Sequence, residues 1–209
     1  MEALTVPALA AADRLVELPP LALSDAVSGA RPALATSVRV GVRAGALLVR
    51  FDGRDAGVVA TYARRDEPLW REDVFEVFLS PLPVPTVYYE FEVNPKGALF
   101  DARVASPEGR RATMAVEVAW NCPGFGARVR VRPGRWSALL TIPLAPMDPT
   151  GAARLWRANF YRIDRGQPDE YSAWRPTLAD PPDFHVPARF GTLLVTPADS
   201  ATGTGSPSR

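Results

Sequence analysis

The sequence predicts an all-β protein, a single-domain antiparallel β-sandwich of jelly-roll type. Short runs in which apolar and polar residues alternate recur along the chain, as they do in strands that bury one face. Pro, Gly and Asn separate these runs and mark turns. No segment keeps the apolar spacing of an amphipathic helix, and 209 residues are enough for one well-buried core.

The chain is expected to divide into three parts. Residues 1–19 are an extended lead-in with at most one edge strand, because Pro19 and Pro20 cannot lie inside a helix. Residues 20–196 form the sandwich. Residues 197–209 are rich in Ala, Thr, Gly, Ser and Pro, a composition typical of a disordered tail.

Strands are expected wherever the alternation runs between turn residues. In chain order they cover residues 38–42, 46–51, 58–62, 74–79, 88–94, 98–104, 114–120, 127–131, 136–142, 156–164 and 190–195. Turns at Ala44-Gly45 and Pro133-Gly134 make two of the pairs hairpins. The passage at residues 165–189 has few strand signals but many aromatic and acidic residues, which is typical of a functional loop.

The strands expected at residues 74–79 and 88–94 have one apolar face and one polar face. Their apolar residues fall on one face, and the other face carries Glu76, Glu90, Glu92 and Asn94, with Trp70 at its entrance. Such a face is either an ordinary solvated surface or a polar recognition surface beside an aromatic platform.

Charge and composition argue against several classes of function. The formal net charge is +1 and basic residues are interspersed with acidic ones, so neither a nucleic-acid partner nor a membrane partner is expected. Cys122 is the single cysteine, which excludes an intramolecular disulfide. The chain starts with an acid where a signal peptide has positive charge, and no apolar run reaches the length of a membrane span. A cytoplasmic protein is therefore expected.

Five dispersed segments carry a further signal. They are Leu-Trp-Arg-Glu-Asp-Val-Phe-Glu-Val-Phe at residues 69–78, Tyr-Glu-Phe-Glu-Val-Asn-Pro-Lys-Gly at 89–97, Trp-Arg-Ala-Asn-Phe-Tyr-Arg-Ile-Asp at 156–164, Trp-Arg-Pro-Thr at 174–177 and Phe-His-Val-Pro at 184–187. In this order they resemble carbohydrate-binding module family 9 and its stand-alone bacterial relatives, within the DOMON-like group of β-sandwiches. The likeness extends over about residues 20–195, and several dispersed motifs are more specific than a single one.

The resemblance implies non-catalytic binding of a saccharide. It places Trp70 and Trp174 on the two faces of one sugar ring, an arrangement that suits the apolar C–H faces of a pyranose. It assigns contacts with the sugar hydroxyls to Glu76 and Asn94, and a strand that carries Asn159 and Tyr161 supplies another. Glu92 departs from the family pattern, because an Arg stands there in the sugar-binding members and an acceptor has replaced a donor.

Two other classes of function stay open at this stage. Glu76 and Glu92 are candidates for the carboxylate pair of a glycoside hydrolase, in which two acids flank the scissile bond. The departure at Glu92 also fits a structural or protein-interaction sandwich that has lost its ligand. The sequence leaves the identity of the sugar and the oligomeric state open.

The resemblance also implies a structural calcium ion, for which the sequence offers oxygen ligands. The candidate carboxylates are Glu72 with Asp73 and Asp180 with Asp183, although no spaced calcium-binding loop is present. His185, the single histidine, stands between Phe184 and Val186 and is interpreted as a packing residue.

Overall fold

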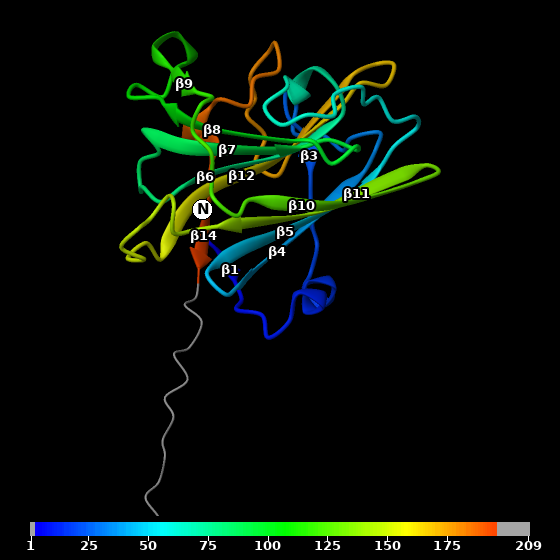
Figure 1. Ribbon diagram of the computed structural model, residues 1–209. Coiled ribbons are helices and arrows are strands. Elements are labelled where there is room, and N and C mark those ends of the chain that lie inside the picture. Colours follow the sequence, from blue (N-terminus) through cyan, green and yellow to red (C-terminus); the bar gives the residue numbers. More distant parts are fainter. Residues whose placement is uncertain (1–2, 196–209) are drawn as a thin grey trace, which may run out of the picture.

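In the computed structural model of the protein, which describes residues 3–195, two β-sheets pack face to face (Figure 1). The predicted antiparallel β-sandwich is confirmed. The helical segments of the described chain are short 3-10 turns: η1 (Ala12–Glu17), η2 (Leu69–Arg71), η3 (Arg111–Thr113) and η4 (Pro187–Arg189). None of the helices in this range is long and apolar enough to cross a membrane. The tail predicted at residues 197–209 lies outside the described residues.

The larger sheet has nine strands. Its main path runs β1 (Leu4–Val6), β14 (Gly191–Val195), β12 (Leu155–Asp164), β6 (Val74–Ser80), β7 (Val87–Val93), β8 (Leu99–Ala105) and β9 (Ala115–Glu117). A branch adds β13 (Glu170–Ala173), which pairs with β12 and with β3 (Ser24–Asp25). The first strand pairs with β14 in parallel, so the lead-in supplies an edge strand of this sheet.

The smaller sheet contains both predicted hairpins. Its five strands run in the order β10 (Gly126–Arg132), β11 (Arg135–Pro143), β5 (Ala46–Arg54), β4 (Thr36–Arg43) and β2 (Leu21–Ala22). The two turns hold Gly45 at φ +74° and Gly134 at φ +75°, a backbone conformation that favours glycine. Both hairpins therefore follow from local sequence.

Several segments differ from the prediction. The short strands β2 and β3 were not predicted, and only Ala115–Glu117 of the strand predicted at residues 114–120 is formed. Residues 58–62 form no strand, because acidic side chains take up their backbone amides: Val59 donates to Asp73 and Thr61 donates to Glu72. Conversely, β13 lies in the passage interpreted as irregular. Its pairing with β12 runs from Tyr161 opposite Ala173 to Asp164 opposite Glu170, a contact that local alternation does not reveal.

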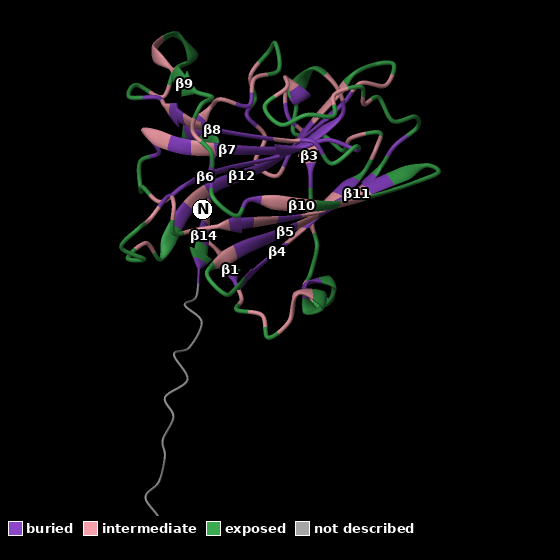
Figure 2. Ribbon diagram, viewed as in Figure 1, coloured by how far each residue is buried: buried purple, intermediate pink, exposed green. Residues whose placement is uncertain are grey.

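The apolar side chains form two clusters on opposite faces of the nine-stranded sheet. The first fills the space between the sheets, where Phe75 stacks on Phe51 at 4.6 Å and on Trp136 at 3.7 Å between ring centroids. The second cluster lies on the outer face and includes Phe78, Tyr88 and Phe100. Loops cover this outer face, and they are less buried than the strands beneath them (Figure 2).

Two polar features complete the core. Arg162, 0% exposed, forms ion pairs with Asp55 and Asp164 and donates to the hydroxyl of Thr36 at 3.0 Å. Cys122, 3% exposed, donates its backbone amide to Asp101. Burial, and then the nearby Asp101 carboxylate, raise the pKa of the Cys122 thiol to about 11.

Candidate functional site

A cavity of about 490 Å³ lies on the outer face of the nine-stranded sheet, beneath the loops. Its lining combines aromatic and aliphatic side chains with acids and arginines: Trp70, Phe100, Met114, Val116, Val118, Ile163, Tyr171, Pro182, Phe184 and His185, with Glu76, Glu90, Asp183, Arg111 and Arg165. This volume and this mixture of apolar walls and few polar groups are typical of small-molecule sites.

Trp70 is placed at the cavity by the short turn η2. Leu69, 0% exposed, anchors the turn in the outer-face cluster, which leaves the next side chain, Trp70, 40% exposed. The indole meets Phe100 edge to face, with ring centroids 5.2 Å apart. The guanidinium of Arg165 donates to the Trp70 carbonyl at 2.7 Å, which holds the turn in place. Trp70 therefore presents a partly free aromatic surface to the cavity.

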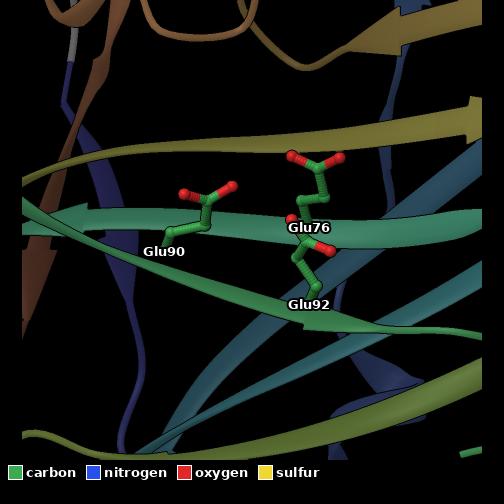
Figure 3. Close-up of side chains that lie close together, drawn as sticks. All are labelled: Glu76, Glu90 and Glu92. Carbon is green, nitrogen blue, oxygen red and sulfur yellow. The ribbon is translucent and has the colours of Figure 1, made fainter. Parts of the chain in front are cut away.

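Three carboxyl groups lie on the sheet beneath Trp70. The β6–β7 pairing places Glu76 opposite Glu92, and Glu90 is two residues away from Glu92 on the same face. The three side chains project to the same side of the sheet (Figure 3). Glu76 is 2% exposed and Glu90 is 5% exposed, and both reach the cavity, whereas Glu92 is 0% exposed and lies beneath it.

Burial shifts the ionisation of all three groups. It raises the pKa of Glu76 and Glu92 well above the ordinary value, and repulsion between the neighbouring carboxylates acts in the same direction. Burial also raises the pKa of Glu90, to about 7. The three carboxyls therefore retain protons at a pH at which surface glutamates are ionised.

The basic groups of the cavity are engaged with other acids. Arg111 makes a two-pronged ion pair with Asp183, with N–O distances of 2.9 and 2.7 Å. Arg165 pairs with Asp169 and donates to the hydroxyl of Tyr171. Within residues 3–195, no ion pair joins a basic side chain to Glu76, Glu90 or Glu92.

His185 lines the cavity as a neutral side chain. Its Nδ1 shares a hydrogen bond of 2.8 Å with the hydroxyl of Tyr88, and its ring packs 5.0 Å from that of Phe78. Burial, and then the positive charge of Arg111, lower the pKa of His185 to about 4. These contacts agree with a packing residue.

Trp174 lies outside the cavity, which corrects the predicted sandwich of one sugar ring between Trp70 and Trp174. The indole packs against the cluster between the sheets, 5.4 Å from the ring of Phe160. Arg175 covers it with its guanidinium 4.4 Å from the ring centroid. A Cβ at Gly191 would come within 2.3 Å of the indole, so the glycine makes room for it.

Three other predicted ligand residues hold loops in place. The side chain of Asn94 donates to Tyr62 and accepts from two backbone amides of the following turn, and Asn159 makes two hydrogen bonds with the backbone of Arg175. Tyr161 donates to the carbonyl of Phe184 and stacks on its ring at 4.2 Å. All three are 0% exposed and do not line the cavity.

The structure also places the other predicted acids. Glu92 is fully buried and does not line the cavity, so the structure does not place Glu76 and Glu92 on either side of a glycosidic bond held there, as a hydrolase pair must be. The calcium candidates Glu72, Asp73 and Asp183 are engaged by Thr61, by backbone amides and by Arg111 respectively. Among the described residues, the acids that converge are Glu76, Glu90 and Glu92.

Several lining residues were not predicted. Phe100, Tyr171 and Arg111 come from three different segments, and only the fold brings them to one cavity. Glu90 is the exception, because it shares the period-two alternation that identified Glu76 and Glu92.

Comparisons with known proteins agree with the fold. The sequence profile of carbohydrate-binding family 9 matches residues 27–195. An extracellular protein of Arthroderma benhamiae is 24% identical over 180 residues, which are 78% of this chain and 80% of that protein.

Two solved structures have the same fold. A candidate carbohydrate-binding protein from Bacteroides uniformis superposes with a TM-score of 0.74 at 21% identity, covering 93% of this chain and 99% of that one. A carbohydrate-binding module of family 9 from Caldicellulosiruptor kristjanssonii, solved with cellotriose, gives a TM-score of 0.68 at 12% identity over 99% of this chain and 100% of its own.

Proposed function

The chain belongs to carbohydrate-binding family 9, and on that premise we propose that it binds a saccharide, without cleaving it, in the cavity beside Trp70. The proposal rests on one observation: an exposed indole and two carboxyl groups line the same cavity. The family membership agrees with the resemblance seen in the sequence. The cavity differs from the expected site because Trp174, the expected second aromatic wall, does not line it.

The chemistry of the cavity suits a sugar ring. The exposed surface of Trp70 offers an apolar platform for the C–H face of a pyranose. Glu76 and Glu90 accept hydrogen bonds from hydroxyls at the rim of the ring, and a protonated carboxyl also donates one. Tyr171, which is half-buried, supplies further aromatic surface.

The fold supports a glucose-type ligand as the first probe, since the module from Caldicellulosiruptor kristjanssonii was solved with cellotriose. The decisive experiment is a calorimetric titration of the protein with glucose, cellotriose and xylotriose. Trp70→Ala is expected to weaken binding about tenfold to a hundredfold, the effect of losing an aromatic anchor of about 1.4–3 kcal/mol.

Trp174→Phe is the matched control. Phenylalanine keeps an aromatic ring against Phe160, outside the cavity, so this variant is expected to retain the affinity of the unmodified protein. If Trp174→Phe loses affinity and Trp70→Ala keeps it, the assignment to this cavity is wrong. Release of shorter sugars from cellotriose would contradict the non-catalytic function.

A further inference from the structure

We propose that Glu76, Glu90 and Glu92 bind a divalent cation at the base of the cavity, and that Ca²⁺ is the ion that suits them best. The site is separate from the carboxylates that the sequence offered for calcium, and it does not depend on the binding of a sugar.

The geometry of the three side chains fits such an ion. One carboxylate oxygen from each lies within 4.8 Å of the others. Oxygen ligands surround Ca²⁺ at about 2.3–2.6 Å, so two oxygens on opposite sides of the ion are about 4.6–5.2 Å apart. Hard carboxylate oxygens without a sulfur or nitrogen ligand favour Ca²⁺, Mg²⁺ or Mn²⁺ over softer metals.

Unpaired oxygens are a second observation that points to a ligand. Oε1 of Glu76 is buried without a hydrogen-bond partner, and both carboxylate oxygens of Glu92 are buried without a well-formed hydrogen bond, although the Glu90 carboxyl and the Trp70 backbone amide lie close to Glu92. Buried polar atoms in folded proteins nearly always have a partner, and buried charges are paired or coordinate a metal. Because Arg111 and Arg165 are held by Asp183 and Asp169, no basic side chain of residues 3–195 fills that role here.

An ion can reach this position through the cavity. Glu76 and Glu90 line the cavity, and Glu92 is buried next to them without lining it. Three protein ligands leave coordination positions on the cavity side, which water or the hydroxyls of a bound sugar can occupy.

The test is a calorimetric titration of the chelator-treated full chain with CaCl₂, and then with MgCl₂ and MnCl₂. One ion per chain is expected, with a rise in the melting temperature. Glu76→Gln and Glu92→Gln are each expected to weaken binding at least tenfold. Gln preserves the shape of the side chain and removes repelling charge, so both variants should fold, which their unfolding transitions verify.

Asp180→Asn and Glu72→Gln are the matched controls, because they change carboxylates outside the cluster. They are expected to bind the ion as the unmodified protein does. The absence of saturable binding by the unmodified protein would overturn the proposal. So would unchanged affinity in Glu76→Gln and Glu92→Gln, or a loss confined to the two controls.

A different feature, on the other sheet, supports a second site. The outer face of the five-stranded sheet carries seven arginines in three rows of paired residues: Arg132, Arg135 and Arg54; Arg130 with Ser137 and Asp52; and Arg128 with Leu139, Arg50 and Arg39. The even mixture of charges along the sequence does not reveal this face, because residues two apart in a strand point to the same side and the paired strands bring them together.

Most of these arginines have no acidic partner. The single acid of the three rows, Asp52, pairs with Arg39 and Arg50. None of the other five takes part in an ion pair within the described chain, and those five are exposed. A hollow of about 750 Å³ runs among Arg50, Arg54, Arg130, Arg132 and Arg135.

We infer that this arginine face binds an acidic polysaccharide through its carboxylate groups. Guanidinium groups bind carboxylates with two parallel hydrogen bonds, and repeated rows suit a repeated charge. The three rows expose no aromatic side chain on which a nucleic-acid base could stack, and the chain belongs to a carbohydrate-binding family.

Polygalacturonate and its methyl-esterified form are the probes for this face, because they share a backbone and differ in charge. Binding to polygalacturonate is expected, weaker at high salt, with little binding to the ester. The double variant Arg130→Gln/Arg132→Gln should lower the affinity at least tenfold, whereas Arg14→Gln/Arg103→Gln, which removes two arginines elsewhere, should not. The inference would be overturned if the protein bound the ester as tightly as polygalacturonate, or if both double variants lost affinity for polygalacturonate equally. Tighter binding of single-stranded DNA than of polygalacturonate would also overturn it.

Discussion

Glu76 and Glu92 stand directly opposite each other on β6 and β7, both buried and with no basic side chain between them. Like charges at opposed positions of an antiparallel pair destabilise a sheet, and burial adds to the cost. An apolar pair would make a more stable strand pairing. We therefore attribute these acids to a ligand, and the following predictions separate that role from the structural roles of their neighbours.

Removing one carboxyl from the cluster should stabilise the protein in the absence of metal. In chelator, Glu92→Gln is expected to raise the free energy of unfolding by about 1–3 kcal/mol at about pH 8, because it removes a buried ionisable carboxyl that neighbouring carboxylates repel, and a pKa difference of one corresponds to about 1.4 kcal/mol. Urea unfolding at about pH 5 and about pH 8 measures the effect.

The direction of the pH dependence follows from the raised pKa of these carboxyls. Such a group holds its proton more tightly in the folded state, so its contribution is favourable at low pH and is lost as the pH rises through the folded pKa. The difference between Glu92→Gln and the unmodified protein should therefore be small at about pH 5. Glu117→Gln, which changes an exposed acid, is the control, and a stabilisation of similar size there would contradict this explanation.

Breaking the buried ion pairs of Arg162 should be costly. Arg162→Ala leaves Asp55 and Asp164 without their partner, and a loss of about 3–5 kcal/mol in the free energy of unfolding is expected. Arg103→Ala removes an exposed pair with Glu117 and should cost less than about 1 kcal/mol. Denaturant unfolding compares the two, and equal losses would argue against this role for Arg162.

Asn159 distinguishes a structural role from a ligand contact. Asn159→Ala removes two hydrogen bonds to the backbone of Arg175, so stability should fall by about 1–3 kcal/mol. Because the side chain does not line the cavity, the affinity for sugar in a calorimetric titration should stay within about twofold of that of the unmodified protein. A tenfold change, which corresponds to about 1.4 kcal/mol, is not expected. A large loss of affinity at unchanged stability would restore the sequence-based assignment.

Local alternation was sufficient to predict the hairpins and the two faces of β6 and β7. The period of two assigned Phe75 to one side and Glu76 to the other without knowledge of the fold. The same pattern could not show that loops cover the polar side, because their closure depends on contacts such as Tyr161 with Phe184, which are distant in sequence. A partly buried face and a solvated one therefore look alike in the sequence.

The position of Trp174 was unpredictable for a related reason. A tryptophan in a loop can cover either face of a sheet, and the side it takes depends on where space exists. Here the space is created by Gly191 on β14, and the hydrogen bonds of Asn159 fix the adjacent backbone. Neither partner is a neighbour of Trp174 in sequence.

The state of Cys122 makes the protein convenient for site-specific labelling. A buried thiol whose pKa is raised to about 11 carries almost no thiolate at neutral pH, and the thiolate is the form that reacts with maleimides and iodoacetamides. A cysteine introduced at an exposed position on the cavity rim, such as Val118→Cys, would then be the reactive one. A fluorophore attached there would report the arrival of a ligand without removal of the native thiol.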